Sequence, residues 1–213
     1  MLLLSLTTAT STCGVALLAD DALLFEAHLH VDRSHARRLA PLVAQAFEHA
    51  GRAPADLDAV AVVAGPGSFT GLRIGASTAK GLCLATGAAL VAVPSHHALA
   101  EPAGDGDLVV LPSRRGEVLA SNGGPMQPVR LADLEAFAAG CARIVGPNAE
   151  AVRDALAEPR AVALRDVRAG TVARLGAARL ARGETEDVAA FEPDYGQAYV
   201  PSRPAPIFGG ARP

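Results

Sequence analysis

The sequence contains no tryptophan, and aromatic residues make up only 4% of its 213 residues. Hydrophobic residues nevertheless account for 50% of the chain. Because large aromatic side chains are scarce, a core must be built from Leu, Val and Ala. The length fits one large domain or two small lobes.

Lysine is almost absent, since Lys80 is the only one and arginine carries the remaining positive charge. The formal net charge is −3, and the chain has no long basic block. Arg33, Arg37 and Arg38 form one cluster, but Asp32 sits beside them. Nucleic-acid binding draws most of its affinity from neutralised phosphates, so this chain alone is a poor candidate for strong RNA or DNA binding.

Cysteine and long apolar runs are also scarce. Cys13, Cys83 and Cys141 are odd in number and far apart, without a Cys-x-x-Cys pair. This pattern predicts buried free thiols in a reducing cytoplasm. No apolar run approaches the roughly 20 residues that a membrane span needs. The apolar start at Met1 lacks a basic region, so it predicts a first strand and no signal peptide.

The pattern that is present alternates strands and helices after an opening meander. The first hundred residues predict strands over 2–8, 12–18 and 23–31, a helix over 34–50, a strand over 57–64, a helix to 86, a strand over 88–93 and a short helix from 95. This order predicts an α/β layer architecture. Residues 102–106 break the composition. We therefore expect a first lobe over 1–101, a smaller second lobe over 102–200 and a flexible tail over 201–213.

The second half has a weaker pattern. It predicts strands over 108–111, 117–121 and 143–145, short helices over 131–139 and 149–156, and a longer amphipathic helix over 167–181. No internal repeat is evident beyond a faint echo of β-β-α between the halves.

A glycine-rich turn links the strand Val60–Val63 to the helix that begins near residue 69. It reads Gly65-Pro66-Gly67-Ser68. Free N–H groups at a helix N-terminus suit an anion, which makes Gly65, Gly67 and Ser68 a candidate phosphate cradle. The Walker pattern is absent because no lysine follows Gly71. The pattern favours a structural turn over a phosphate cradle on this chain alone.

The helix after that turn carries a stripe of small residues. Gly71, Gly75, Ala79 and Cys83 are spaced by four, which places them on one helix face. Such a helix has poor intrinsic propensity and makes sense if another backbone comes close. That neighbour is either the chain's own sheet or a helix of a partner.

These segments resemble a known family, the TsaB proteins, which bacteria need for threonylcarbamoyl modification of the adenosine beside the tRNA anticodon. The resemblance lies in residues 65–75 (Gly-Pro-Gly-Ser-Phe-Thr-Gly-Leu-Arg-Ile-Gly) and 78–82. Weaker agreement follows at 6–17, 34–42 and 114–118, and a faint Pro-x-Tyr at 193–195. The match is specific over about the first hundred residues.

The resemblance implies a two-lobed actin-like ATPase (ASKHA, ribonuclease H-like) α/β fold with mixed sheets and a reduced second lobe. It also implies a non-catalytic subunit that binds TsaD through its first two long helices, pairs with itself when alone, and meets TsaE and tRNA in the larger complex. It leaves open whether ATP or ADP binds at the complex interface. The matching partner-contact residues are His35, Arg38, Leu39, Leu42, Leu72, Arg73, Gly75, Ala76, Ala79 and Lys80.

Departures from the family pattern argue against an ATPase site on this chain. Thr7 stands where an acidic residue usually ends the first strand, and Pro112, Ser113 and Leu119 replace family residues in the second lobe. A TsaD-like nucleotide-binding transferase, a peptidase-like enzyme and a dimeric scaffold for another partner remain alternatives.

Metal and catalytic residues are not assigned. His97 and Glu101 are four residues apart, but Ala100 stands where a second histidine would pair with His96. His28 and His30 share a strand face without a third ligand. No Gly-x-Ser-x-Gly motif occurs in the sequence.

Overall fold

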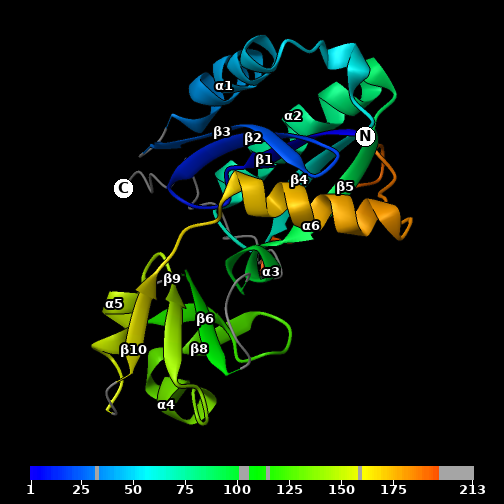
Figure 1. Cartoon of the computed structure of the whole chain (residues 1–213). Helices are drawn as coiled ribbons and strands as arrows, with labels where there is room; N and C mark the ends of the chain where they lie inside the picture. The colour runs from blue at the N-terminus through cyan, green and yellow to red at the C-terminus, as the bar shows by residue number, and fades with distance from the viewer. Residues whose placement is uncertain (32–33, 101–105, 114–115, 158–159, 197–213) are drawn as a thin grey trace, which may run out of the picture.

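The computed structural model describes residues 1–31, 34–100, 106–113, 116–157 and 160–196. Two five-stranded mixed sheets, each with its own helices, form two lobes (Figure 1). The predicted two-lobed α/β architecture is confirmed.

The first sheet holds the opening meander and two parallel strands in the order β3-β2-β1-β4-β5. β1 pairs antiparallel with β2 and parallel with β4. The strand bounds are β1 Leu2–Thr7, β2 Thr12–Ala19, β3 Ala22–His30, β4 Ala59–Gly65 and β5 Ala89–Pro94. Because both faces of its central strands are covered, β1 is buried along its whole length.

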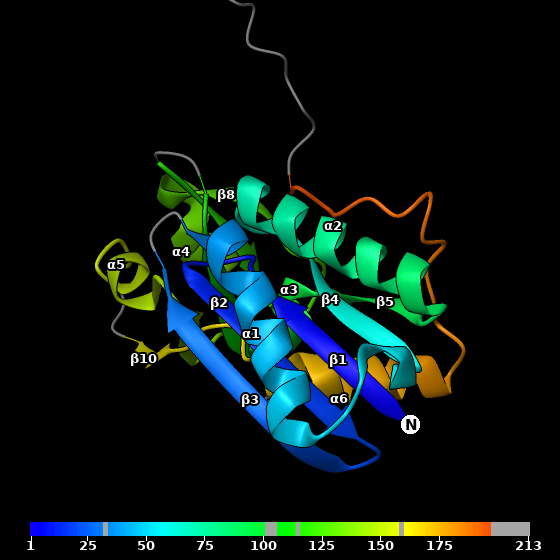
Figure 2. The same ribbon diagram turned by 90° about the horizontal axis from the view of Figure 1, so that it is seen from above.

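Three helices cover the first sheet. α1 (His35–Ala50) lies over β2 and β3, and α2 (Phe69–Thr86) lies over β4 and β5, so the two run side by side on one face (Figure 2). α6 (Ala169–Ala181) covers the opposite face (Figure 1). A short 3₁₀ turn, Pro54–Asp56, precedes β4. The predicted ends of α1 at residue 50 and of α2 at residue 86 are confirmed. The residues that follow, Gly51 and Gly87, adopt the left-handed conformation that ends a helix.

The second sheet repeats the topology of the first. Its order is β10-β9-β6-β7-β8, with β6–β7–β8 antiparallel and β6–β9–β10 parallel. The bounds are β6 Asp107–Pro112, β7 Glu117–Ser121, β8 Gln127–Arg130, β9 Arg143–Gly146 and β10 Ala161–Leu164. Two copies of one strand order are what the actin-like fold class requires, and that class is confirmed.

The second lobe is reduced in its helices and not in its number of strands. In the part that the structure describes, its helical elements are one 3₁₀ turn and two short helices: Leu131–Asp133, α4 Leu134–Phe137 and α5 Ala149–Arg153. A further short helix, α3 (Ser95–Ala100), contacts strands of both sheets. The two strands β8 and β10 were missed by the sequence pattern, because β8 is short, largely exposed and contains Pro128, while β10 has only four residues.

The helix predicted over 167–181 is present, but its assignment to the second lobe was wrong. α6 packs across β1, β2 and β4 of the first sheet. Its small residues allow this close approach: a Cβ on Gly176 would lie 2.5 Å from the Cβ of Ala61. The boundary near residue 101 stays a prediction, and the predicted tail over 201–213 lies outside the described residues.

The core is aliphatic, as the composition predicts. Phe47 and Phe191 are the only aromatic side chains among the buried core residues that the structure describes. One apolar cluster lies between the first sheet and α1 and α2, and a third lies within the second lobe. The remaining cluster joins the lobes, because Val109, Leu111 and Leu119 pack with first-lobe residues. All three cysteines are buried and free, which confirms the prediction of buried free thiols.

Candidate functional site

The glycine-rich turn is pressed against the loop between β1 and β2. The backbone N–H of Ser68 donates to the carbonyl oxygen of Ala9 at 2.7 Å. A Cβ on Gly67 would lie 2.5 Å from that oxygen, and one on Gly71 would overlap the carbonyl oxygen of Thr8. Ser68 caps the helix by accepting from the N–H of Gly71 at 3.2 Å. The N–H groups of Ser68 and Gly71, two donors that an anion would need, therefore already have partners within the chain.

The opposite side of the turn is covered by residues 183–196, which we call the strap. The N–H of Asp194 donates to the carbonyl oxygen of Ala64 at 2.7 Å. Gly65 has φ 106° and precedes a cis bond to Pro66. A Cβ at this position would overlap the backbone carbonyl oxygen of Asp194, so the close approach of the strap requires glycine here. The ring of Tyr195 lies 4.6 Å from that of Phe69, centre to centre. The strap thus joins the Pro-x-Tyr segment to the glycine-rich motif.

The single lysine of the chain holds the strap in place. The Nζ of Lys80, on α2, donates to the carbonyl oxygens of Ala189 at 3.0 Å and Phe191 at 3.1 Å. Glu186 adds a backbone bond to Leu90 and so covers the β5 edge of the first sheet. Lys80 therefore contacts its own chain, although the resemblance assigned it to a partner.

Replacing Lys80 by methionine is expected to loosen the strap without unfolding the lobes. Methionine keeps the apolar stem but loses both hydrogen bonds, which costs about 1 kcal/mol in this partly exposed position. Hydrogen exchange of residues 184–194 should become faster while that of β1 stays unchanged. Lys80→Arg is the matched control and should retain most of the exchange protection of the strap. Equal exchange rates in wild type and Lys80→Met would show that Lys80 does not hold the strap.

A pocket of about 340 Å³ opens between the strap and strands β4 and β5. Its acidic lining consists of Glu186, Asp187, Glu192 and Asp194. The backbone N–H groups of Ala190 and Ala189 lower the pKa of Asp187, so this carboxylate is already hydrogen-bonded as an anion. Among the described residues, no group of three or more His, Cys, Asp or Glu side chains is arranged to hold a metal ion.

Most of the expected partner-contact residues are buried inside the chain. These buried residues are His35, Leu39, Leu42, Leu72, Gly75, Ala76 and Ala79. A Cβ on Gly75 would lie 2.6 Å from the Oγ1 of Thr8, so the small face of α2 packs on its own lobe. The interpretation of this face as a partner surface was wrong, because the first sheet and its β1–β2 loop already cover it. Arg38 and Arg73 are exposed, as a partner contact requires.

The outward faces of α1 and α2 carry a second set of small residues that sequence reasoning missed. The exposed ones are Ala36, Ala40 and Ala44 on α1, and Ser77, Gly81 and Ala85 on α2. Leu84 stands among them with 75% of its surface exposed. The small residues recur every four positions on each of these two helices. This spacing is the sequence signal that could have identified the outward faces. Because α2 has small residues on both its buried and its exposed face, other backbone segments can approach it closely on both sides.

The β1–β2 loop does not offer a place for a nucleotide phosphate. Thr7 is fully buried, and its Oγ1 has no hydrogen-bond partner in the part of the chain that the structure describes. The hydroxyls of Thr10 and Thr12 both donate to the carboxylate of Asp166, which thus takes the position of an anion at this loop. His35 donates from Nε2 to the Thr10 carbonyl oxygen at 3.0 Å. The residues present therefore do not fit a nucleotide that the actin-like fold would otherwise suggest.

The candidate histidines do not converge. Burial lowers the pKa of His96, with the neighbouring His97 adding to this effect, and the ring Nδ1 of His96 is buried without a partner in the described chain. Glu101, which the sequence placed beside His97, lies outside the described residues. His28 contacts the N-terminus of α6 instead of a metal.

Known proteins are similar to this chain in sequence and in fold. A family model described as TsaD, tRNA N6-adenosine threonylcarbamoyltransferase, matches residues 29–133. The TsaB protein of Bacillus subtilis (strain 168), described as a tRNA threonylcarbamoyladenosine biosynthesis protein, is 35% identical over 55% of this chain and 53% of its own length. A crystal structure from Pseudomonas aeruginosa, described as an uncharacterized protein similar to peptidase YeaZ, superposes with a TM-score of 0.80 at 26% identity and covers 92% of this chain and 99% of that one. The chain is thus similar to TsaB and YeaZ proteins in sequence over about half of its length and in fold over most of it.

The chain is similar in sequence to a threonylcarbamoyltransferase as well. A tRNA N6-adenosine threonylcarbamoyltransferase of Solidesulfovibrio magneticus is 38% identical over 62% of this chain and 38% of its own length. The chain spans about half the length of the curated TsaB relatives it matches.

No helix among the described residues is long and apolar enough to cross a membrane.

Proposed function

We propose that this chain is a non-catalytic subunit of the threonylcarbamoyladenosine machinery and that it binds and activates TsaD through the outward faces of α1 and α2. The observation that carries the proposal is the set of exposed small residues on α1 and α2. These two helices lie beside each other on one face of the first sheet (Figure 2). Small side chains let a partner's helices come close. The similarity to TsaB proteins supports TsaD as that partner.

The charges of α1 also suit an external helix. Arg37 and Arg38 lie in its first turn, which has no acidic residue, and Glu48 lies near its C-terminal end. Both ends oppose the helix dipole. An antiparallel partner helix would place its own ends next to these charges with favourable sign. A stable interface of this kind buries about 1,200 Å² or more.

The remaining roles in this proposal concern self-association, the larger complex and its ligands. The chain alone binds itself through this face, and TsaD replaces the second copy in the complex, which TsaE then joins. The tRNA is reached only through the complex, since the chain has no long basic block. Any ATP or ADP binds at the complex interface, because the β1–β2 loop of this chain is filled by Asp166. The complex works in the cytoplasm.

The test is co-purification of the full chain with TsaD, followed by tRNA modification with and without this chain. We expect a stable complex and tRNA modification that depends on adding the chain. Absence of a complex at micromolar concentrations, or full modification without the chain, would refute the proposal. Calorimetric titration of the chain alone with ATP and magnesium should show no saturable binding; micromolar binding with turnover would support an enzyme instead.

A further inference from the structure

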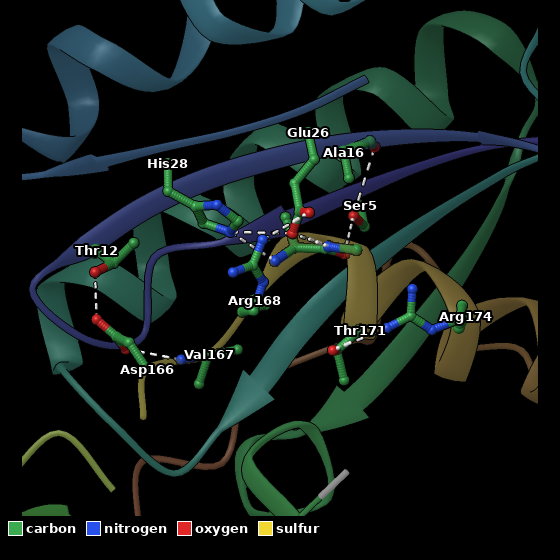
Figure 3. Close-up of polar contacts among 12 residues, drawn as sticks. Ser5, Thr12, Ala16, Glu26, His28, Asp166, Val167, Arg168, Thr171 and Arg174 are labelled. Carbon is green, nitrogen blue, oxygen red and sulfur yellow. Dashed lines mark hydrogen bonds and ion pairs between the residues drawn. The ribbon is translucent and has the colours of Figure 1, made fainter. Parts of the chain in front are cut away.

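The linker between β10 and α6, residues 165–168, is tied to the first sheet by an unusual set of polar contacts (Figure 3). This linker carries the chain from the second lobe back to the first. Asp166 accepts hydrogen bonds from the hydroxyls of Thr10 and Thr12, and also from the N–H of Val167 at 2.8 Å. Its carboxylate therefore holds the linker to the β1–β2 loop.

The first turn of α6 is capped by side chains of a strand and not by its own N-cap residue. The N-cap residue Arg168 makes no side-chain cap bond. Glu26 on β3 accepts from the N–H of Gly170 at 2.9 Å and pairs with the Arg168 guanidinium at 2.9 Å. Ser5 on β1 donates to the carbonyl oxygen of Ala169 at 2.7 Å. The start of α6 thus depends on strands distant in the sequence.

The capping contact of His28 requires one protonation state. The N–H of Ala169 donates to His28 Nε2 at 2.9 Å, so this nitrogen must carry a lone pair and the imidazole must be neutral. Protonation at Nε2 would place two N–H groups against each other. Figure 3 shows the ring directed at the helix start.

We infer that these contacts form a polar latch between the lobe linker and the first sheet, and that the latch opens in acid when His28 takes up a proton. The charged groups that face His28 are Glu26 on its own strand, and Asp166 and Arg168 on the linker. A protonated His28 gains little from Glu26, 3.5 Å away, whose oxygens already accept from Gly170 and Arg168. Opening releases the first turn of α6, while the apolar cluster between the lobes remains packed.

The direction of the pH effect follows from the environment of His28. Burial lowers its pKa below the ordinary 6.5, and Glu26 opposes this only in part. Burial acts to raise the pKa of Glu26, but the hydrogen bonds from Arg168 and Gly170 outweigh it, so Glu26 stays ionised. The latch is therefore complete above about pH 6.5 and weakens as the pH falls from there to the folded pKa of His28. One proton is linked, which limits the change to about tenfold per pH unit.

The experiment is hydrogen exchange of residues 166–172 in the full chain at pH 7.5 and pH 5.5, corrected for the intrinsic pH dependence of exchange. We expect the opening equilibrium of this segment to be larger at pH 5.5 than at pH 7.5, with about tenfold as the upper limit for one linked proton. His28→Gln supplies a neutral acceptor at both pH values and should remove the response. His30→Gln, on the same strand, is the matched control and should retain it.

A pH-independent opening in wild type would overturn the latch, and so would an undiminished response in His28→Gln. The wild-type protein offers a second readout that needs no variant: the amide resonances of Ala169 and Gly170 should move together with the ring protonation of His28. Independent titration of the two would equally refute the inference.

Discussion

Replacing Gly71 by alanine is expected to lower the free energy of unfolding by about 3 kcal/mol. The added Cβ would overlap the carbonyl oxygen of Thr8, and backbone cannot yield as the end of a flexible side chain can. The same displacement would strain the hydrogen bond from the Thr8 hydroxyl to the carbonyl oxygen of Gly71, now 2.7 Å long. Urea denaturation monitored by circular dichroism measures the loss, because the chain has no tryptophan to report by fluorescence.

Gly81→Ala on the same helix is the matched control. No atom lies within 4 Å of a Cβ there, so the variant should be stabilised by about 0.5–1 kcal/mol through helix propensity alone. If Gly71→Ala were as stable as wild type, the close packing of α2 on the β1–β2 loop would be wrong. For the same reason Gly75→Leu should damage folding, and it is unsuitable as a test of partner binding.

Replacing Leu84 by arginine is expected to weaken TsaD binding at least about 100-fold while leaving the fold intact. Leu84 is 75% exposed, so a charge there costs little in the free chain. At the proposed interface the same charge would be buried among small apolar residues without a partner. Calorimetric titration of TsaD into the variant measures the affinity, and thermal unfolding checks the fold.

Leu131→Arg provides the comparison, because Leu131 is also an exposed leucine, at 36%, but lies in the second lobe. It should bind TsaD as wild type does. Wild-type affinity in Leu84→Arg, or equal losses in both variants, would exclude the outward faces of α1 and α2 as the docking surface. Sedimentation of Leu84→Arg alone tests self-association by the same surface.

The sequence alone determined the succession of strands and helices along the first lobe and the ends of its helices. Alternating apolar segments, a serine at the start of α2 and glycines at the ends of α1 and α2 are local signals, and each acts within one turn or strand. The strands of the second lobe are less predictable from the sequence, because short strands such as β10 are stabilised by pairing with their neighbours in the sheet. The repeated strand order is visible only in the pairing of the two sheets.

Tertiary structure decided which features of the site face outward. The spacing of Gly71, Gly75 and Ala79 showed that a close neighbour exists, but spacing is blind to whether that neighbour is the chain's own sheet or another protein. The structure places the β1–β2 loop there and turns Leu84 to the solvent. It also brings Asp166 to Thr10 and His28 to Ala169 from opposite ends of the chain. Such contacts depend on how the helices pack onto the sheet, and the local sequence does not determine that packing.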